Sequence, residues 1–313
     1  IWAGGALNVV VLCGYLALDS IGPLLLLVRV LHGLAEAMLF SALFTYAADH
    51  VPAGRRTQGL ALFGVSGMLP IALGGLLGDL LLPDLGFRAV FLASIAFAAA
   101  SLLVSLPLPE KARGEPEAGV SLGLRAALGQ ADLQPLWFLG LGFSVALTAC
   151  YVFVRRYVDE TGIGSVGLFF STYTAAALLL RVALGWLPDR AGPKRVLAPA
   201  LVSLVAGFAW MSRAVDAADL AWAGLLCGLG HGFTFPILFG LVVTRTPEAN
   251  RGVAMAVFTA LFDIGLLIGG PLLGGLIETW GFAVTFAVAG AGLAGGALVF
   301  FVWDGRLARV ACP

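Results

Sequence analysis

Six ionisable residues interrupt long apolar stretches of this sequence, at positions where a charge is costly. They are Arg29, His32, Glu36, Arg181, His231 and Asp263. On insertion scales, an ionised side chain at the centre of a bilayer costs about 2.5–3.5 kcal/mol, so each of these residues requires a partner or a function. Titratable groups in such places can carry a proton or hold a charged group of a solute away from lipid.

Three of these residues are predicted to share one face of a helix. Arg29, His32 and Glu36 are spaced by three and then four residues, which places their side chains in one row on an α-helix. A cation, an imidazole and a carboxylate on one face predict a proton or substrate site. The alternative is structural, because Arg29 and Glu36 could instead form an ion pair that braces neighbouring helices.

The other three interior residues each allow two interpretations. His231 is a candidate for the same pathway, although a single histidine in a membrane helix is often only a hydrogen-bonded structural residue. Asp263 can carry protons, or it can pair with a basic group on a neighbouring helix. Arg181 is close to a predicted helix end, where extension of its side chain to the interface is the simpler explanation.

The elements that position these residues are predicted to be membrane-spanning helices. Sixty per cent of the residues are apolar and only 12% are charged, whereas about a quarter of average residue usage is charged. Runs of about 20 apolar residues, the length that crosses a bilayer, recur along the chain without the alternation of membrane strands. We predict ten spans, at 1–18, 22–48, 58–81, 88–107, 134–154, 165–187, 196–213, 218–244, 253–277 and 282–303.

The distribution of Lys and Arg orients these spans. If span 1–18 starts in the cytoplasm, most basic residues fall in cytoplasmic loops, and only Arg88, Arg155, Arg156 and Arg213 fall opposite. Both ends of the chain are therefore expected on the cytoplasmic side of the inner (plasma) membrane. The four cysteines have no paired spacing and no metal-binding or phosphate-binding motif is found, so we expect no metal and no cofactor.

The longest polar stretch, 108–133, separates four predicted spans from six. It predicts an N-terminal half-bundle of four spans at 1–107, a cytoplasmic linker at 108–133, a six-helix bundle at 134–303 and a cytoplasmic tail at 304–313. The later part of the linker, with Leu124 and Leu128 beside Arg125, forms either a short interfacial helix or an irregular segment.

An internal repeat relates the two parts of the chain. Residues 33–91 align without a gap on residues 228–286 at a constant offset of 195, and Gly-Phe pairs at 86–87 and 281–282 fall in register. Such a parallel repeat of helical segments indicates a duplicated transporter half. The offset aligns Glu36 with His231, so we expect them at similar depth on opposite sides of a central pathway. Asp263 aligns with Met68 and has no polar counterpart.

The third and ninth predicted spans are rich in glycine and contain proline. Small residues four apart allow close helix packing, and proline permits a bend. The residues concerned are Gly67, Pro70, Gly74, Gly75, Gly269, Gly270, Pro271 and Gly274. They suit two half-bundles that rock against each other, although helix packing alone also explains them.

The loop at 185–195, Gly-Trp-Leu-Pro-Asp-Arg-Ala-Gly-Pro-Lys-Arg, resembles the signature loop of the major facilitator superfamily. Its matching residues are Gly185, Asp189, Arg190, Gly192, Lys194 and Arg195. The element Arg29-x-x-His32-Gly33 and the Gly-Phe-Arg at 86–88 are similar to further elements of that family. In such a basic turn, the carboxylate of Asp189 can cap a helix end and pair with arginines.

The resemblance implies an all-α polytopic fold of two pseudo-symmetric helical bundles. The ten predicted spans would correspond to helices 3–12, so the chain is expected to lack the first two. It further implies that the protein is a monomer that carries a small organic solute, drug-like or sugar-like, across the bilayer by alternating access. The expected coupled ion is the proton, and the expected direction is efflux by antiport.

Other functions stay open on the sequence alone. The family's antiporter motif is matched incompletely, since Pro70 follows Gly67 by three residues and the third span has no Gly-Pro pair. Proton-coupled uptake of a metabolite, and a non-transporting receptor or fragment, are therefore alternatives. Gly64-Val65-Ser66-Gly67 also matches a motif of intramembrane proteases, but the repeat has no place in that fold. We expect no enzyme activity and no nucleic-acid partner.

Overall fold

The chain folds into two compact units. A computed structural model describes residues 1–18, 20–50, 63–64, 66–67, 69–108, 124–247 and 250–310. The units are Ile1–Pro116 (unit 1) and Glu117–Pro313 (unit 2), and each is described by itself. The boundary between them lies within the polar stretch 108–133. All regular secondary structure in the described residues is α-helical.

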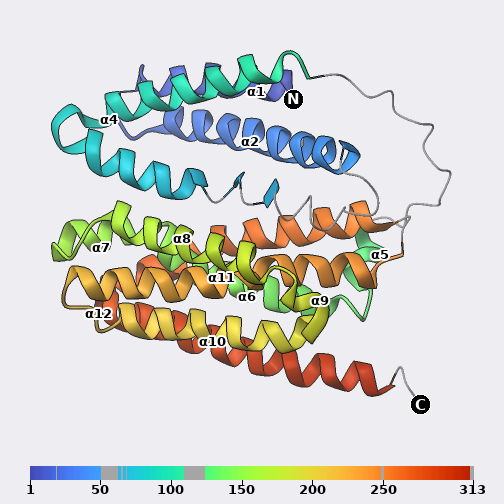
Figure 1. Ribbon diagram of the computed structural model, residues 1–313. Helices are drawn as coiled ribbons and strands as arrows, with labels where there is room; N and C mark the ends of the chain where they lie inside the picture. The colour runs from blue at the N-terminus through green and yellow to red at the C-terminus, as the bar shows by residue number, and fades with distance from the viewer. Residues whose placement is uncertain are drawn as a thin grey trace. The chain divides into compact units, whose positions relative to one another are not determined.

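The helices are labelled in Figure 1. Those described in unit 1 are α1 (Trp2–Tyr15), α2 (Pro23–His50) and α4 (Leu69–Ser105). Those described in unit 2 are α5 (Leu124–Gly129), α6 (Gln134–Tyr151), α7 (Val154–Thr161), α8 (Val166–Leu184), α9 (Leu187–Ala191), α10 (Pro193–Met211), α11 (Ala217–Arg245) and α12 (Arg251–Val310). Seven stretches of described helix are long and apolar enough to cross a membrane.

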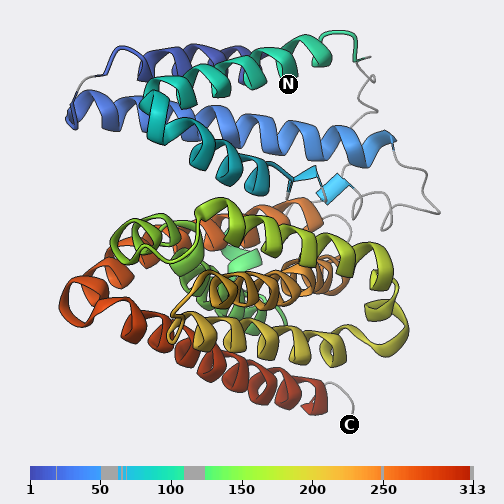
Figure 2. The same cartoon turned by 60° about the vertical axis from the view of Figure 1, so that its left-hand side comes forward.

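Two of these stretches, α4 and α12, each consist of two helices joined at one glycine. Gly86 has φ 69° and ψ −175°, and Gly281 has φ 76° and ψ 176°. A positive φ of this kind is readily adopted only by glycine. The chain reverses direction within α4 (Figure 1) and within α12 (Figure 2). Together with α1, α2, α6, α8, α10 and α11, the four limbs confirm the predicted architecture of ten apolar helical segments.

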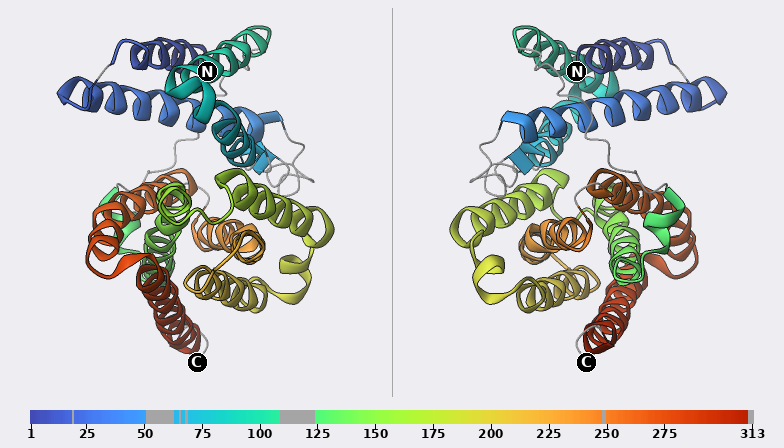
Figure 3. Two further views of the ribbon diagram at one scale, coloured as in Figure 1. Left: turned by 90° about the vertical axis from the view of Figure 1, so that its left-hand side faces the viewer. Right: turned by 90° about the vertical axis from the view of Figure 1, so that its right-hand side faces the viewer.

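The internal repeat is visible in backbone geometry and in helix neighbours. Gly86 and Gly281 are separated by the offset of 195 and share one unusual conformation. In unit 1, α1 packs against α2 and α4, and in unit 2, α10 packs in the same way against α11 and α12. Unit 2 adds α6 against α12 and α8 against α11. Figure 3 shows unit 2 nearly along its helices, with α11 between α8 and α10.

The extra helices give unit 2 the larger interior. Its fully buried side chains include Phe143, Phe169 and Phe208, whereas the described interior of unit 1 centres on Val11 and Tyr15. Inside a bilayer, such contacts stabilise the helices by van der Waals packing rather than by removing apolar surface from water. The site residues of unit 2 are therefore held by close packing on several sides.

At three places the described helices differ from the predicted boundaries or extend them. The helix α12 continues to Val310, so Asp304 lies within a helix. A short helix, α5, occupies the later part of the predicted linker, as one of the two interpretations expected. The third predicted span, 58–81, is described as continuous helix from Leu69, and its residues 58–62 lie outside the described residues.

Candidate functional site

Three polar side chains from three helices meet inside unit 2. His231 lies in the middle of α11, Tyr151 is the last residue of α6, and Tyr173 lies in α8. Nδ1 of His231 is 3.0 Å from the Tyr151 hydroxyl and also contacts the Tyr173 hydroxyl, while the two hydroxyls are 3.1 Å apart. The sequence analysis selected His231 but neither of the tyrosines.

The hydroxyls and the imidazole can form one hydrogen-bonded chain. In the tautomer with the ring proton on Nε2, Nδ1 accepts from one hydroxyl, and that hydroxyl accepts from the other. His231 is only 7% exposed and Tyr173 is fully buried. Among the described residues, no hydrogen bond to Nε2 is found.

Arg181 supplies a positive charge beside this cluster. From α8, its Nε donates to the carbonyl oxygen of Gly232 at 2.9 Å, one residue beyond His231. Gly232 directly follows His231, so Arg181 contacts α11 next to the residue that carries the imidazole. The structure shows this contact with α11, and the expected extension of the side chain to the membrane interface stays a prediction.

Glycines in α11 allow α8 to come this close. A Cβ added to Gly228 would collide with the backbone of Tyr173, and one added to Gly232 would lie 3.1 Å from Cα of Ala177. Small residues at such contacts are how membrane helices bring their backbones together. The hydroxyl of Tyr173 reaches His231 because these two positions have no side chain.

Half-buried phenylalanines extend the site along α11. Phe235 and Phe239 follow His231 at four-residue intervals, with ring centroids 6.2 Å apart for His231 and Phe235 and 6.0 Å apart for Phe235 and Phe239. Phe262 of α12 meets Phe235 edge to face at 5.2 Å. The polar cluster therefore borders a wall of aromatic rings.

The predicted helix face in unit 1 is confirmed, and its side chains gather around Tyr15 of α1. The Tyr15 hydroxyl is 3.2 Å from Nδ1 of His32, and the guanidinium carbon of Arg29 lies 5.6 Å from the centre of the Tyr15 ring. Nε2 of His32 is 3.8 Å from Oε1 of Glu36. The structure therefore pairs Glu36 with His32, and no bracing ion pair between Arg29 and Glu36 is found among the described residues.

The remaining predicted residues are not brought into these clusters. Asp263 is an exposed residue of α12, and no described residue forms an ion pair with it. Glu36 and His231 belong to different units, so their placement across one pathway stays a prediction. Met68, the repeat partner of Asp263, lies outside the described residues.

The predicted signature loop is anchored through its lysine. Lys194, at the start of α10, forms an ion pair with Asp304 of α12. Arg245, at the end of α11, holds the other side of the same carboxylate, with Nη1 2.5 Å from Oδ1 and Nη2 3.2 Å from Oδ2. The side chain of Asp304 is 3% exposed, so this one carboxylate joins α10, α11 and α12.

The rest of the loop makes fewer contacts. Gly185 and Gly192 lie on either side of the one-turn helix α9, and Gly192 has a φ of 94°. Arg190 stacks on Trp186 at 5.1 Å. Asp189 and Arg195 are exposed, and no described helix end is capped by Asp189. The cap expected of this carboxylate is therefore absent from the described residues.

The predicted packing glycines divide into packed and open positions. In α12, a Cβ on Gly269 would overlap the side chain of Thr148 in α6, and one on Gly274 would lie 3.4 Å from the Phe153 ring. The other predicted positions are Gly67, in a turn, Pro70, Gly74 and the buried Gly75 of unit 1, and Gly270 and Pro271 of α12. A Cβ on Gly74 or Gly270 would meet nothing within 4 Å. Close packing is thus shown for Gly269, whereas Gly274 leaves room for ordinary contact.

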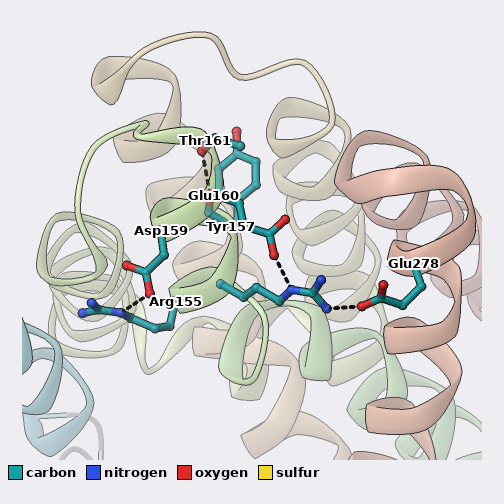
Figure 4. Close-up of polar contacts among 7 residues, drawn as sticks. Arg155, Tyr157, Asp159, Glu160, Thr161 and Glu278 are labelled. Atoms are coloured by element: carbon teal, nitrogen blue, oxygen red, sulfur yellow. Dashed lines mark hydrogen bonds and ion pairs between the residues drawn. The ribbon is translucent and has the colours of Figure 1, made fainter.

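A surface network ties α7 to the turn of α12. Arg156 lies between two carboxylates, with Nε 2.5 Å from Glu160 and Nη1 2.6 Å from Glu278, while Arg155 pairs with Asp159 within α7 (Figure 4). Exposed pairs of this kind contribute little stability each. Their position matters more, since α7 continues from the helix that carries Tyr151, and Glu278 precedes the Gly281 reversal.

Comparison with known proteins places the chain in a family. The profile of the Major Facilitator Superfamily matches residues 1–211 and, in a second match, residues 158–310. The chain belongs to the Major Facilitator Superfamily. Its fold is also similar to the crystal structure of the human organic anion transporter MFSD10 (TETRAN), with a TM-score of 0.73, 17% sequence identity and coverage of 96% of this chain and 76% of that one. At that identity the likeness concerns the fold.

Bacterial members of the superfamily are similar in sequence. The probable galactarate/D-glucarate transporter GarP of Escherichia coli (strain K12) is 34% identical over 135 residues, which are 40% of this chain and 30% of that protein. The uncharacterized MFS-type transporter YhhS of Salmonella paratyphi C (strain RKS4594) is 27% identical over 236 residues, 73% of this chain and 55% of that protein. The chain thus matches 30% of the length of GarP and 55% of the length of YhhS.

The sequence analysis did not predict two tyrosines and one aspartate of the site. Tyr151 and Tyr173 lie in apolar runs, where a tyrosine resembles any other aromatic residue. Asp304 lay outside the predicted spans and was assigned to the tail. The sequence signal for the tyrosines was their position within predicted spans that accompany a span with an interior histidine, His231.

Proposed function

We propose that the chain acts as a proton-coupled secondary transporter that exports a small organic solute by alternating access. The observation that carries this is the buried cluster of His231, Tyr151 and Tyr173, because polar and titratable groups inside a membrane bundle mark solute and proton paths. The names of two similar proteins agree with an organic solute, since GarP is described as a probable galactarate/D-glucarate transporter and MFSD10 as an organic anion transporter.

In this proposal, the protein works as a monomer in the inner membrane with both ends of the chain in the cytoplasm. The distribution of Lys and Arg supports that orientation. Close contacts such as Gly269 against Thr148 support movement of whole helix groups, because tightly packed helices move as rigid bodies.

Glu36 is proposed as the carrier of the coupled proton. Its side chain is 65% exposed within the described structure and lies next to His32, which in turn contacts the Tyr15 hydroxyl. The carboxylate, the imidazole and the phenol are neighbours in space and form a path along which a proton can move. The exposed end of that path is Glu36, so this residue exchanges its proton with water or solute.

The test uses the purified chain in proteoliposomes with labelled D-glucarate as the first solute. Glu36→Gln removes the titratable proton but keeps the size and polarity of the side chain. We expect flux driven by a pH gradient to be lost, while exchange of labelled for unlabelled solute continues without a gradient. Both rates are measured from the label retained in the vesicles.

Glu278→Gln is the matched control, because Glu278 is also 65% exposed and also lies beside a basic group. It should leave both rates close to those of the unchanged chain. Equal pH-driven flux in Glu36→Gln and in the unchanged chain would remove Glu36 from the mechanism. Absence of any solute flux in the unchanged chain, with a panel of organic solutes, would contradict the transport function itself.

A further inference from the structure

Close backbone contacts divide the helices of unit 2 into two groups. The α11 group consists of α8, α10 and α11, with α11 between the other two (Figure 3). A Cβ on Gly228 of α11 would collide with the carbonyl oxygen of Tyr173 in α8, and one on Gly230 would lie 2.7 Å from that of Ala200 in α10. Helices that meet this closely move together, because close-packed interiors shift as rigid bodies.

The α6 group consists of α6 and the first limb of α12, residues 251–280. A Cβ on Gly265 of α12 would lie 2.7 Å from the carbonyl oxygen of Leu141 in α6, and one on Gly269 would lie 3.0 Å from that of Val145. These two helices are therefore also joined backbone to backbone.

Side chains connect the two groups, along a contact between α11 and the α6 group that we call the seam. No described glycine of α11 faces α6 or α12. Instead, the ring centroids of Phe143 in α6 and His231 are 5.5 Å apart, and those of Phe258 and Phe262 in α12 lie 5.8 and 5.2 Å from that of Phe235. Each such ring pair contributes little beyond its buried area, so the seam can separate more easily than the backbone contacts within each group.

At one end, the second limb of α12, residues 282–310, holds the two groups together. Its Asp304 binds Lys194 of α10 and Arg245 of α11, and the carboxylate is 3% exposed. On the other side, the ring of Trp303 in the same limb lies 6.3 Å from that of Phe138 in α6. This limb therefore contacts both groups near the start of α6.

At the other end of α6, the Tyr151 hydroxyl crosses the seam. It lies 3.0 Å from Nδ1 of His231 and 3.1 Å from the hydroxyl of Tyr173. His231 and Tyr173 both belong to the α11 group and contact each other. The histidine thus has one hydroxyl partner from its own group and one from across the seam.

We propose that the seam is a gate, in which the α6 group swings away from the α11 group at the Tyr151 end while the Asp304 end stays joined. The bond between Tyr151 and His231 closes this gate, and Tyr173 stays with the histidine when the gate opens. The proposal rests on the transport function proposed above and states how unit 2 exposes its polar cluster to solute.

Two native cysteines report on the gate. Cys150 directly precedes Tyr151, Cys227 lies one helical turn before His231, and the two thiols are hydrogen-bonded to each other across the seam. Both residues are fully buried. A thiol reagent in water therefore reaches them when the gate opens, so the labelling rate measures the population of the open state.

Labelling with N-ethylmaleimide tests the gate on the purified chain in detergent, without any solute. The background carries Cys13→Ser and Cys312→Ser, which leaves Cys150 and Cys227 as the thiols, and mass spectrometry follows the reaction. Tyr151→Phe removes the hydroxyl that crosses the seam. It should accelerate labelling about three- to tenfold, since one hydrogen bond shifts an opening equilibrium by up to about one order of magnitude.

Tyr173→Phe is the matched control, because it removes a hydroxyl from the same histidine but leaves the Tyr151 bond to His231 in place. It should change the labelling rate by less than about twofold. Equal acceleration in both variants, or none in Tyr151→Phe, would overturn the proposal. The cross-linking experiment below needs neither variant and decides the question if Tyr151→Phe does not fold.

A cross-link between the same two cysteines tests the gate during transport. A short bifunctional methanethiosulfonate that joins Cys150 to Cys227 should reduce solute flux in proteoliposomes by at least about tenfold, and dithiothreitol should restore it. Methyl methanethiosulfonate modifies the thiols without joining them and should leave most of the flux. Full flux in the cross-linked chain, or equal inhibition by both reagents, would overturn the gate. Absence of flux in the untreated chain, with faster labelling in Tyr151→Phe, would contradict transport and leave the gate standing.

Discussion

Helices α2 and α11 are the two copies of one helix of the repeat, yet their surroundings are opposite. At Gly228 of α11, a Cβ would collide with the backbone of Tyr173, whereas at the equivalent Gly33 of α2 nothing lies within 4 Å. His231 is 7% exposed, and the side chain of its counterpart Glu36 is 65% exposed. The difference follows from α6 and α8, because the described residues of unit 1 contain no helix in the equivalent places.

The comparison shows what the repeat preserves and what neighbours decide. The reversals at Gly86 and Gly281 and the packing of α1 or α10 on its two partners are the same in both copies. The role of a residue on the face of α2 or α11 that points away from α1 or α10 depends on whether another helix covers that face. A titratable group there becomes part of a closed polar network in one copy and an exposed acid in the other.

The largest difference is expected at the ends of the two helices. Arg245 and His50 are equivalent in the repeat, but Arg245 binds the buried carboxylate of Asp304, whereas Nδ1 of His50 lies 2.8 Å from Tyr46 O of its own helix. Removing this carboxylate takes away its charge-assisted hydrogen bonds to Arg245, and a hydrogen bond to a charged group contributes about 1.5–3 kcal/mol. Asp304→Ala should therefore lower the free energy of unfolding far more than His50→Ala, as measured by chemical unfolding in detergent with circular dichroism.

Asp159→Ala serves as the control for loss of a carboxylate. Asp159 pairs with Arg155 at 2.8 Å but both side chains are about half exposed, so the expected loss is below about 1 kcal/mol. A similar loss for Asp304→Ala would show that the three-helix junction is no more than a surface pair. A large loss for His50→Ala would contradict the asymmetry between the two helix ends.

The second prediction concerns the paired glycines and gives effects of opposite sign. Gly228→Ala forces a methyl group into the Tyr173 backbone, and overpacking of this kind costs about 1–3 kcal/mol. Gly33→Ala meets open space and should stabilise α2 by about 0.5–1 kcal/mol, because alanine loses less backbone entropy in a helix. Thermal unfolding of the two variants under one detergent condition measures both effects.

Gly74→Ala and Gly269→Ala repeat the experiment on an independent pair. Gly269 lies against Thr148 of α6, whereas its counterpart Gly74 meets nothing within 4 Å. Destabilisation by both unit 1 variants would mean that these faces of α2 and α4 are covered, and the contrast between the copies would then have to be abandoned.

The fold was predictable because its signals are local. Apolar runs long enough to cross a bilayer, and an offset that places Gly86 on Gly281, require no knowledge of packing. The face shared by Arg29, His32 and Glu36 follows from helical spacing alone, and the structure confirms it. The family also follows from a local motif, the loop 185–195.

The contacts of the site were less predictable, because they depend on which helices meet. Tyr151 and Tyr173 reach His231 only where α6 and α8 converge on α11, and spacing within one helix cannot report that. The hydrogen bond from Arg181 to the carbonyl of Gly232 was not predictable either, because it depends on where α8 meets α11. The ion pairs of Asp304 join three helices, so no single segment of sequence contains them.

The smallest effects are expected for the tyrosine hydroxyls. Two hydroxyls contact the histidine in unit 2, whereas one does so in unit 1. In unit 2, Tyr173→Phe leaves the Tyr151 hydroxyl 3.0 Å from Nδ1 of His231, so the loss in the free energy of unfolding should be about 0.5–1.5 kcal/mol. In unit 1, Tyr15 bonds to the less enclosed His32 at 3.2 Å, where water can replace a lost hydroxyl. Tyr15→Phe should therefore cost less than about 0.5 kcal/mol.

The double variant Tyr151→Phe with Tyr173→Phe decides whether the unit 2 hydroxyls act as one network. Each single variant leaves one hydroxyl for Nδ1, but the double variant leaves a buried acceptor without a donor, which costs about 1–3 kcal/mol. The loss in the double variant should therefore exceed the sum of the two single losses, as a double-mutant cycle measures. Simple additivity would mean that the two hydroxyls act independently on the imidazole. A closed hydrogen-bond network could then no longer explain how His231 differs from Glu36.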